Sequence, residues 1–149
     1  MTTASLDTVT FANTRPFVPP LREVKVVKTY DGDTITVAAP LCGDVYRFSV
    51  RIKGIDCPEM KSADPNEKTV ATKAKEFVQA LLLHQMVTLE HIETEKYGRL
   101  LAEVWYQGQS VATLLVNERL AVAYDGGHKT PPSNWLEYWA GTSETSPTK

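Results

Sequence analysis

Two short acidic turns carry the side chains with the clearest potential for chemistry. The first is Asp31-Gly32-Asp33, and the second is Asp56-Cys57-Pro58-Glu59. Pro58 restricts the backbone of the second turn, so that its carboxylates and a backbone carbonyl can be aimed at one point. Such oxygen ligands, completed by water, are those that a hard cation such as calcium prefers. The sequence offers no Cys/His cluster of the kind that binds zinc, so calcium is favoured.

Arg51 and Arg99 add positive charge to these turns. Arg51 lies five residues before Asp56, and Arg99 follows Gly98, which permits a sharp turn. Carboxylates for a metal, a further carboxylate for a water molecule and two guanidinium groups together suit the stabilisation of a phosphoryl transition state. A simpler interpretation of each motif stays open, because an Asp-Gly pair is a common hairpin turn and a single arginine is commonly an exposed charge.

The composition is that of a globular domain with little net charge. The 149 residues include 16 basic and 18 acidic side chains, a net charge of −2 that argues against strong binding of nucleic acids. Local clustering outweighs it, because six basic residues are expected to flank the proposed site: Arg47, Arg51, Lys53, Lys61, Lys96 and Arg99. The chain shows no secretory signal and no apolar run of roughly 18 residues, so an intracellular location is expected. With only Cys42 and Cys57, reduced thiols are expected.

Strands must position the two turns. β-Branched runs at 24–30 and 34–37 predict a hairpin around the first acidic turn. Strict alternation over 45–52 predicts a third strand, with Arg51 on the same face as Arg47. Two more strands are predicted at 86–92 and 100–106.

Helix-start signals lie between and after these strands. Asp64 is predicted to cap a helix that begins at Pro65, with Glu67 completing a capping box. Ser110 is predicted to cap a second, short helix. Asn134 is predicted to start a helical turn that brings Trp135 and Trp139 onto one face, either to bury that surface against the domain or to anchor a partner.

Four motifs in this order resemble the staphylococcal (micrococcal) nuclease family, also called thermonucleases. The motifs are Tyr30-Asp31-Gly32-Asp33-Thr34, residues 51–59, Lys96-Tyr97-Gly98-Arg99 and Leu120-Ala121. The resemblance implies an α+β, mainly β fold: a five-stranded OB-like Greek-key barrel with about three helices. It further implies a calcium-dependent endonuclease that cleaves DNA and RNA, preferably single-stranded, with the 5′-oxygen as leaving group and 3′-phosphate ends. We expect one calcium ion per active site and a monomer.

Matched position by position, the resemblance implies a role for each site residue. Calcium would be bound by the side chains of Asp33 and Asp56 and by the carbonyl of Cys57. Asp31 would support this metal site without binding the ion directly. Glu59 would orient or deprotonate the attacking water, and Arg51 and Arg99 would hold the phosphate. Lys96 and Tyr97 would contact a neighbouring phosphate, and Tyr124 would pack beside a base.

The chain also departs from the family's founding member. That protein has a second tyrosine where this chain has Gly126, and a mobile lysine-rich loop where residues 62–68 here predict an ordered helix start. The predicted organisation is a flexible arm at 1–23, a nuclease domain at 24–127 and a C-terminal extension at 128–149, partly docked and disordered at its end. A non-catalytic nucleic-acid-binding module, or a protein-interaction module using Trp135 and Trp139, is the alternative function.

Overall fold

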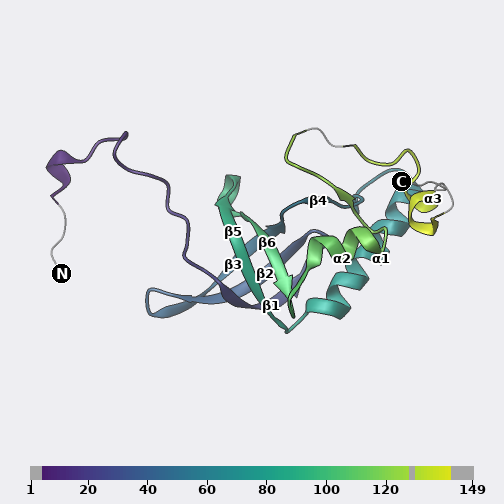
Figure 1. Ribbon diagram of the computed structural model, residues 1–149, viewed down its shortest axis with the longest axis horizontal. Helices are drawn as coiled ribbons and strands as arrows, with labels where there is room; N and C mark the ends of the chain where they lie inside the picture. Colours follow the sequence, from purple (N-terminus) through teal and green to yellow (C-terminus); the bar gives the residue numbers. More distant parts are fainter. Residues whose placement is uncertain (1–4, 128–129, 142–149) are drawn as a thin grey trace.

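A barrel of five strands forms the centre of the protein, which a computed structural model describes over residues 5–127 and 130–141. The strands are β1 (Glu23–Thr29), β2 (Thr34–Leu41), β3 (Asp44–Ile52), β5 (Met86–Thr94) and β6 (Leu100–Tyr106). They pair in the order β3-β2-β1-β5-β6, and a parallel pairing of β3 with β6 closes the barrel. The predicted α+β, OB-like fold is therefore confirmed (Figure 1).

Three short strands complete the β structure. β7 (Gln109–Ser110) extends β6, while β4 (Ile55–Asp56) and β8 (Val122–Ala123) form an antiparallel pair outside the barrel. Tight turns precede β3 and follow β6, where Gly43 and Gly108 adopt positive φ angles of 85° and 79°. The β4–β8 pair matters most for the site, because it holds the second acidic turn in place.

Helices α1 (Pro65–Leu82), α2 (Val111–Asn117) and α3 (Trp135–Ala140) lie together at one end of the barrel (Figure 1). Each begins at the predicted cap: the side chains of Asp64, Ser110 and Asn134 accept hydrogen bonds from backbone N–H groups of the first turn. The buried face of α1 covers the apolar interior of the barrel. It consists of Val70, Ala71, Ala74, Val78 and Leu82.

The predicted capping box at the start of α1 is wrong. The backbone N–H of Asp64 donates to Ser62 Oγ at 3.0 Å, so Glu67 has no need to reach it. The Glu67 carboxylate instead accepts from the N–H of Glu59 and from the hydroxyl of Ser62. The contact between the Glu67 carboxylate and the N–H of Glu59 links α1 to the second acidic turn.

The segment after residue 130 folds back onto the helical end of the domain. Trp135 is 3% exposed and belongs to the hydrophobic core, and Tyr138 donates its hydroxyl proton to the carbonyl of Ala121 at 2.9 Å. Trp139 is 36% exposed and lies under the ammonium of Lys73, 4.4 Å from the ring centre. Burial of Trp135 favours packing over the partner-anchor interpretation. The predicted disorder at the C-terminal end falls at 142–149, outside the described residues.

Within residues 5–22 of the N-terminal arm, the buried positions lie at the end next to β1. Pro19 and Leu21 are buried, and the carbonyl of Arg22 accepts a hydrogen bond from the N–H of Leu89 in β5 at 2.7 Å. Before Pro19 the chain leads away from the barrel, with a short 3-10 helix η1 (Leu6–Thr8) near its start (Figure 1). None of the described helices combines the length and apolar character that crossing a membrane demands.

Candidate active site

Six of the predicted site residues line one open cleft of about 580 Å³ on the side of the barrel. They are Asp31, Asp33, Arg51, Cys57, Glu59 and Arg99. They come from four separate segments of the chain, so the fold brings together what the sequence keeps apart.

The first acidic turn connects β1 and β2 and is held from both sides. The N–H of Asp33 donates to the carboxylate of Asp31 at 3.1 Å, and the carbonyl of Asp33 accepts from the N–H of Ile52 in β3 at 2.8 Å. The φ angle of Gly32 is not positive, so the turn does not need glycine for its backbone conformation, as a hairpin turn of the Asp-Gly type would. A Cβ at Gly32 would stand 2.8 Å from the Cβ of Ala74 in α1 and 2.9 Å from the sulfur of Cys57. The glycine therefore allows close packing of three segments.

Asp56 and Arg51 bring opposite charges together beside the cleft, which Arg51 lines and Asp56 does not. Asp56 lies in β4, opposite Val122 of β8, and is 5% exposed. The guanidinium of Arg51 lies 3.8 Å from an oxygen of Asp56 and 4.0 Å from an oxygen of Asp33. Arg51 thus stands between the two predicted metal ligands, where it offsets part of their mutual repulsion.

Negative charge is concentrated around the first acidic turn. Burial, followed by repulsion from the Asp33 carboxylate, raises the pKa of Asp31 from 3.8 to about 7. Burial also raises the pKa of the Cys57 thiol, and the carboxylates of Asp33, Asp31 and Asp56 raise it further. The thiol faces Gly32 and is 4% exposed, so Cys57 acts here as a buried side chain and not as a nucleophile.

The donor atoms of this cleft are of the kind that hard cations bind. Asp33 and Asp56 each offer carboxylate oxygens close to the Arg51 guanidinium, and Cys57 offers a backbone carbonyl next to Asp56 in the chain. A divalent cation would relieve the repulsion that raises the pKa of Asp31. By ligand chemistry, the residues present fit such a cation.

Glu59 is exposed at the rim of the cleft, and α1 holds its backbone. One carboxylate oxygen of Glu67 accepts from the N–H of Glu59 at 2.8 Å, and the other accepts from the hydroxyl of Ser62 at 2.9 Å. Ser62 closes the turn by donating its own N–H to the carbonyl of Glu59 at 3.2 Å. Glu67 thus fixes the backbone from which the Glu59 side chain enters the cleft.

Arg99 reaches the cleft from a sharp turn between β5 and β6. The 3-10 turn η2 (Lys96–Gly98) reverses the chain, with φ angles of 64° at Tyr97 and 79° at Gly98. The side chain of Arg99 is paired with Glu95 at 3.0 Å. Of the remaining predicted substrate residues, Lys96 and Tyr97 do not line this cleft, and Tyr97 is fully exposed.

Tyr124 lies in a second cleft that shares Arg51 with the first. The guanidinium carbon of Arg51 is 5.7 Å from the centre of the Tyr124 ring. The backbone N–H of Tyr124 donates to the carbonyl of Gly54 at 2.9 Å, next to the β4–β8 pair. The fold thus places the predicted base-contacting ring directly beside a predicted phosphate-binding arginine.

Residues 49–138 match the model of a protein family described as staphylococcal nuclease homologue. The chain belongs to this family. A thermonuclease of Staphylococcus hyicus is 35% identical over 101 residues, which cover 66% of this chain and 57% of that protein. An uncharacterized endonuclease of Haemophilus influenzae is 33% identical over 100 residues, covering 67% and 51%. A probable endonuclease of Schizosaccharomyces pombe is 33% identical over 86 residues, covering 53% and 37%. The chain therefore spans between about a third and three fifths of each relative's length.

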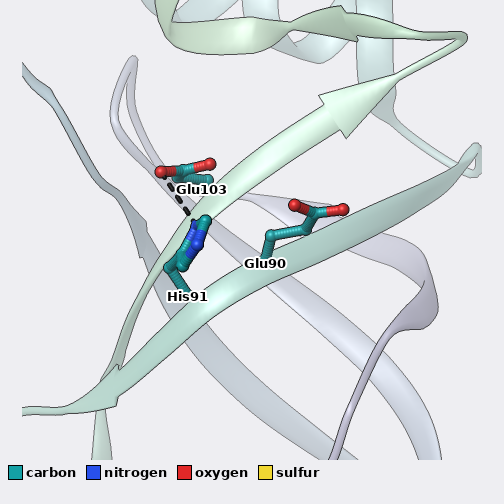
Figure 2. Close-up of side chains that lie close together, drawn as sticks. All are labelled: Glu90, His91 and Glu103. Atoms are coloured by element: carbon teal, nitrogen blue, oxygen red, sulfur yellow. Dashed lines mark ion pairs between the residues drawn. The ribbon is translucent and has the colours of Figure 1, made fainter.

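A separate cluster of potential metal ligands lies on β5 and β6, away from the cleft of this nuclease homologue. Ligand atoms of Glu90, His91 and Glu103 lie within 4.8 Å of one another (Figure 2). Each carboxylate already has a protein partner: Arg22 pairs with Glu90 at 3.3 Å, and the imidazole of His91 pairs with Glu103 at 3.1 Å. These contacts describe an ion-pair cluster around an irregularity in β5, where His91 has a φ of 53°.

Sequence reasoning missed several residues of the main cleft. Lys28, Tyr30, Thr36 and Ser49 line it next to the predicted residues. Ser49 lies two residues before Arg51 and so shares its face of the strand, but only strand register shows which residues of β1 and β2 stand beside it. Glu67 was assigned to the helix cap, and no sequence signal distinguishes that role from its contact with Glu59.

Proposed function

We propose that the chain is a calcium-dependent endonuclease that hydrolyses phosphodiester bonds in DNA and RNA and leaves 3′-phosphate ends. The observation that carries the proposal is the arrangement of Asp33, Arg51, Glu59 and Arg99 around one open cleft. Membership in the nuclease homologue family and the names of the relatives support it.

In this proposal the carboxylates bind the metal ion and the arginines bind the phosphate of the substrate. Asp33, Asp56 and the carbonyl of Cys57 would hold one calcium ion, with Asp31 supporting Asp33 through its hydrogen bond. Calcium, when bound, would supply charge that stabilises the phosphate as negative charge develops on it. Arg51 and Arg99 would bind the phosphate oxygens through charge-assisted hydrogen bonds. Arg99 must exchange its partner Glu95 for the substrate, which its exposure permits.

Glu59 would act on the attacking water. The water oxygen forms a bond to phosphorus while the bond from phosphorus to the 5′-oxygen breaks. Glu59 accepts the proton of the water, and the departing 5′-oxygen takes a proton from solvent, which leaves the phosphate on the 3′-oxygen. Tyr124, beside Arg51, would pack against a base of the substrate, and Lys96 and Tyr97 would contact a phosphate further along the strand.

A cleavage panel of metals and substrates tests the proposal. Single-stranded DNA, duplex DNA and RNA are incubated with calcium, with other divalent cations and with EDTA, and the ends of the products are identified. We expect calcium-dependent cleavage that leaves 3′-phosphate ends and is lost in Glu59→Gln and in Arg51→Ala. Glu76→Gln, a change at an exposed carboxylate of α1, is the matched control. Binding without cleavage in the presence of calcium would support the non-catalytic module, and 5′-phosphate ends would contradict the chemistry.

A further inference from the structure

The solvent face of β1, β2 and β3 continues the active-site cleft as a second row of polar side chains. Arg51 in β3 stands opposite Thr34 in β2. Two residues along, Ser49 stands opposite Thr36, which in turn stands opposite Lys28 of β1. Residues two apart in a strand share a face and are roughly 7 Å apart. The row Lys28–Thr36–Ser49 therefore runs beside the row of Arg51, on the same wall of the cleft.

An aromatic ring accompanies these two rows. Tyr30 follows β1 directly, and its N–H donates to the carbonyl of Thr34 at 3.1 Å. Its side chain lines the cleft while 58% of the residue is exposed to solvent. The ring thus has a free surface in the cleft, on the β1 side of Thr34.

Lys28 differs from Lys53 and Arg99, two other cations near the site, in its freedom to bind an anion. Lys53 is paired with Glu93 at 2.6 Å, and Arg99 is paired with Glu95. Over residues 5–127 and 130–141, no carboxylate comes within ion-pairing distance of the Lys28 ammonium. The positive charge of Lys28 faces the cleft without a competing partner.

We propose that Lys28, Thr36 and Ser49 bind the next phosphate along the strand after the scissile one, with Tyr30 stacking on the base of the nucleotide beyond the two that the scissile phosphate joins. This inference rests on the proposed nuclease function. An ammonium group and two hydroxyls bind phosphate oxygens without regard to sequence, and an exposed aromatic ring stacks on any unpaired base. Stacking needs a base that is not paired with a second strand, so the ligand of this subsite is single-stranded nucleic acid.

Arg51 lines both the active-site cleft and the second cleft, which contains Tyr124. A strand whose scissile phosphate lies at Arg51 can therefore place one base beside Tyr124 and continue across β1 to β3 past Lys28.

Cleavage of substrates of two lengths tests the subsite. We compare kcat/KM on a dinucleotide, which is too short to fill it, with kcat/KM on a long single-stranded oligonucleotide. Lys28→Ala and Tyr30→Ala should each lower kcat/KM on the long substrate about 5- to 10-fold more than on the dinucleotide, mainly through KM. Lys28→Ala should also reduce the slope of log KM against log salt by about 0.7. The matched control is Lys25→Ala, an exposed lysine of β1 outside the cleft.

Binding measured without catalysis separates this inference from the proposed function. Fluorescence anisotropy of the same labelled oligonucleotide in EDTA should show weaker binding for Lys28→Ala and Tyr30→Ala than for Lys25→Ala. If wild type does not cleave but this order of binding holds, the subsite is supported and the proposed catalysis is overturned. If Lys28→Ala and Tyr30→Ala match Lys25→Ala on both substrates and in binding, the subsite is overturned whatever the catalytic activity.

Discussion

Replacement of Glu67 by alanine should slow cleavage even though Glu67 does not line the cleft. Its carboxylate accepts hydrogen bonds from the N–H of Glu59 at 2.8 Å and from the hydroxyl of Ser62 at 2.9 Å. A hydrogen bond to a charged group contributes about 1.5–3 kcal/mol, and partial exposure favours the lower figure. Loss of about 1.4 kcal/mol from the productive arrangement of Glu59 corresponds to a fall in kcat of about 10-fold. KM should change little, because the phosphate-binding arginines are not touched.

A double-mutant cycle with Glu59→Ala shows whether Glu67 acts through Glu59. Steady-state cleavage is measured for both single variants, for the double variant and for Glu76→Ala, an exposed position on the same helix. In the Glu59→Ala background, Glu67→Ala should cause no further loss. Glu67→Gln keeps one accepting oxygen and should have intermediate activity. An equal loss of kcat in both backgrounds, or a loss no larger than in Glu76→Ala, would refute the reasoning.

Three further predictions concern stability. Gly32→Ala places a Cβ 2.8 Å from the Cβ of Ala74, so it should destabilise the fold by about 1–3 kcal/mol, as measured by denaturant titration. An unchanged unfolding midpoint would contradict the packing role of Gly32. Trp135→Ala removes a core side chain and should cost about 3–5 kcal/mol, and a loss below about 1 kcal/mol would mean that α3 is not part of the cooperative unit. The third concerns pH in EDTA: native Asp31 holds its proton up to about pH 7, whereas the unfolded chain releases it near 3.8. Deprotonation over this range therefore favours the unfolded state, so wild-type stability should fall as pH rises, with a shallower slope in Asp31→Asn. Equal slopes would exclude Asp31 as the cause.

Local patterns were sufficient to predict most of the elements. The alternation of β3 and the cap residues Asp64, Ser110 and Asn134 each predicted a feature that the structure contains. These features depend on neighbours within a few residues, where the periods of strands and helices and the chemistry of caps decide the outcome. The pairing of β3 with β6, which closes the barrel, has no local signal in the sequence.

The site was predictable in its residue types and less so in its contacts. The resemblance named Asp33, Arg51 and Glu59, and the fold brings them to one cleft. The reason for Gly32 was not visible, since an Asp-Gly pair suggests a turn with positive φ, while the contact that requires glycine comes from α1. The role of Lys28 was not predicted for a similar reason. Alternation shows which face of a strand a residue lies on, but it does not show which residues of the next strand lie beside it.

The parallel pairing of β3 with β6 has a consequence for the order of events in folding. Arg51 stands opposite Leu101 in this pairing, and the N–H of Lys53 donates to the carbonyl of Ala102 at 2.8 Å. Partners so distant along the chain meet only after a large loop has closed, and such contacts are slow to form. The β1–β2–β3 meander, whose contacts are local, can form earlier and already carries Asp33 and Arg51. Nuclease activity during refolding should therefore lag behind the formation of strand structure and appear together with barrel closure.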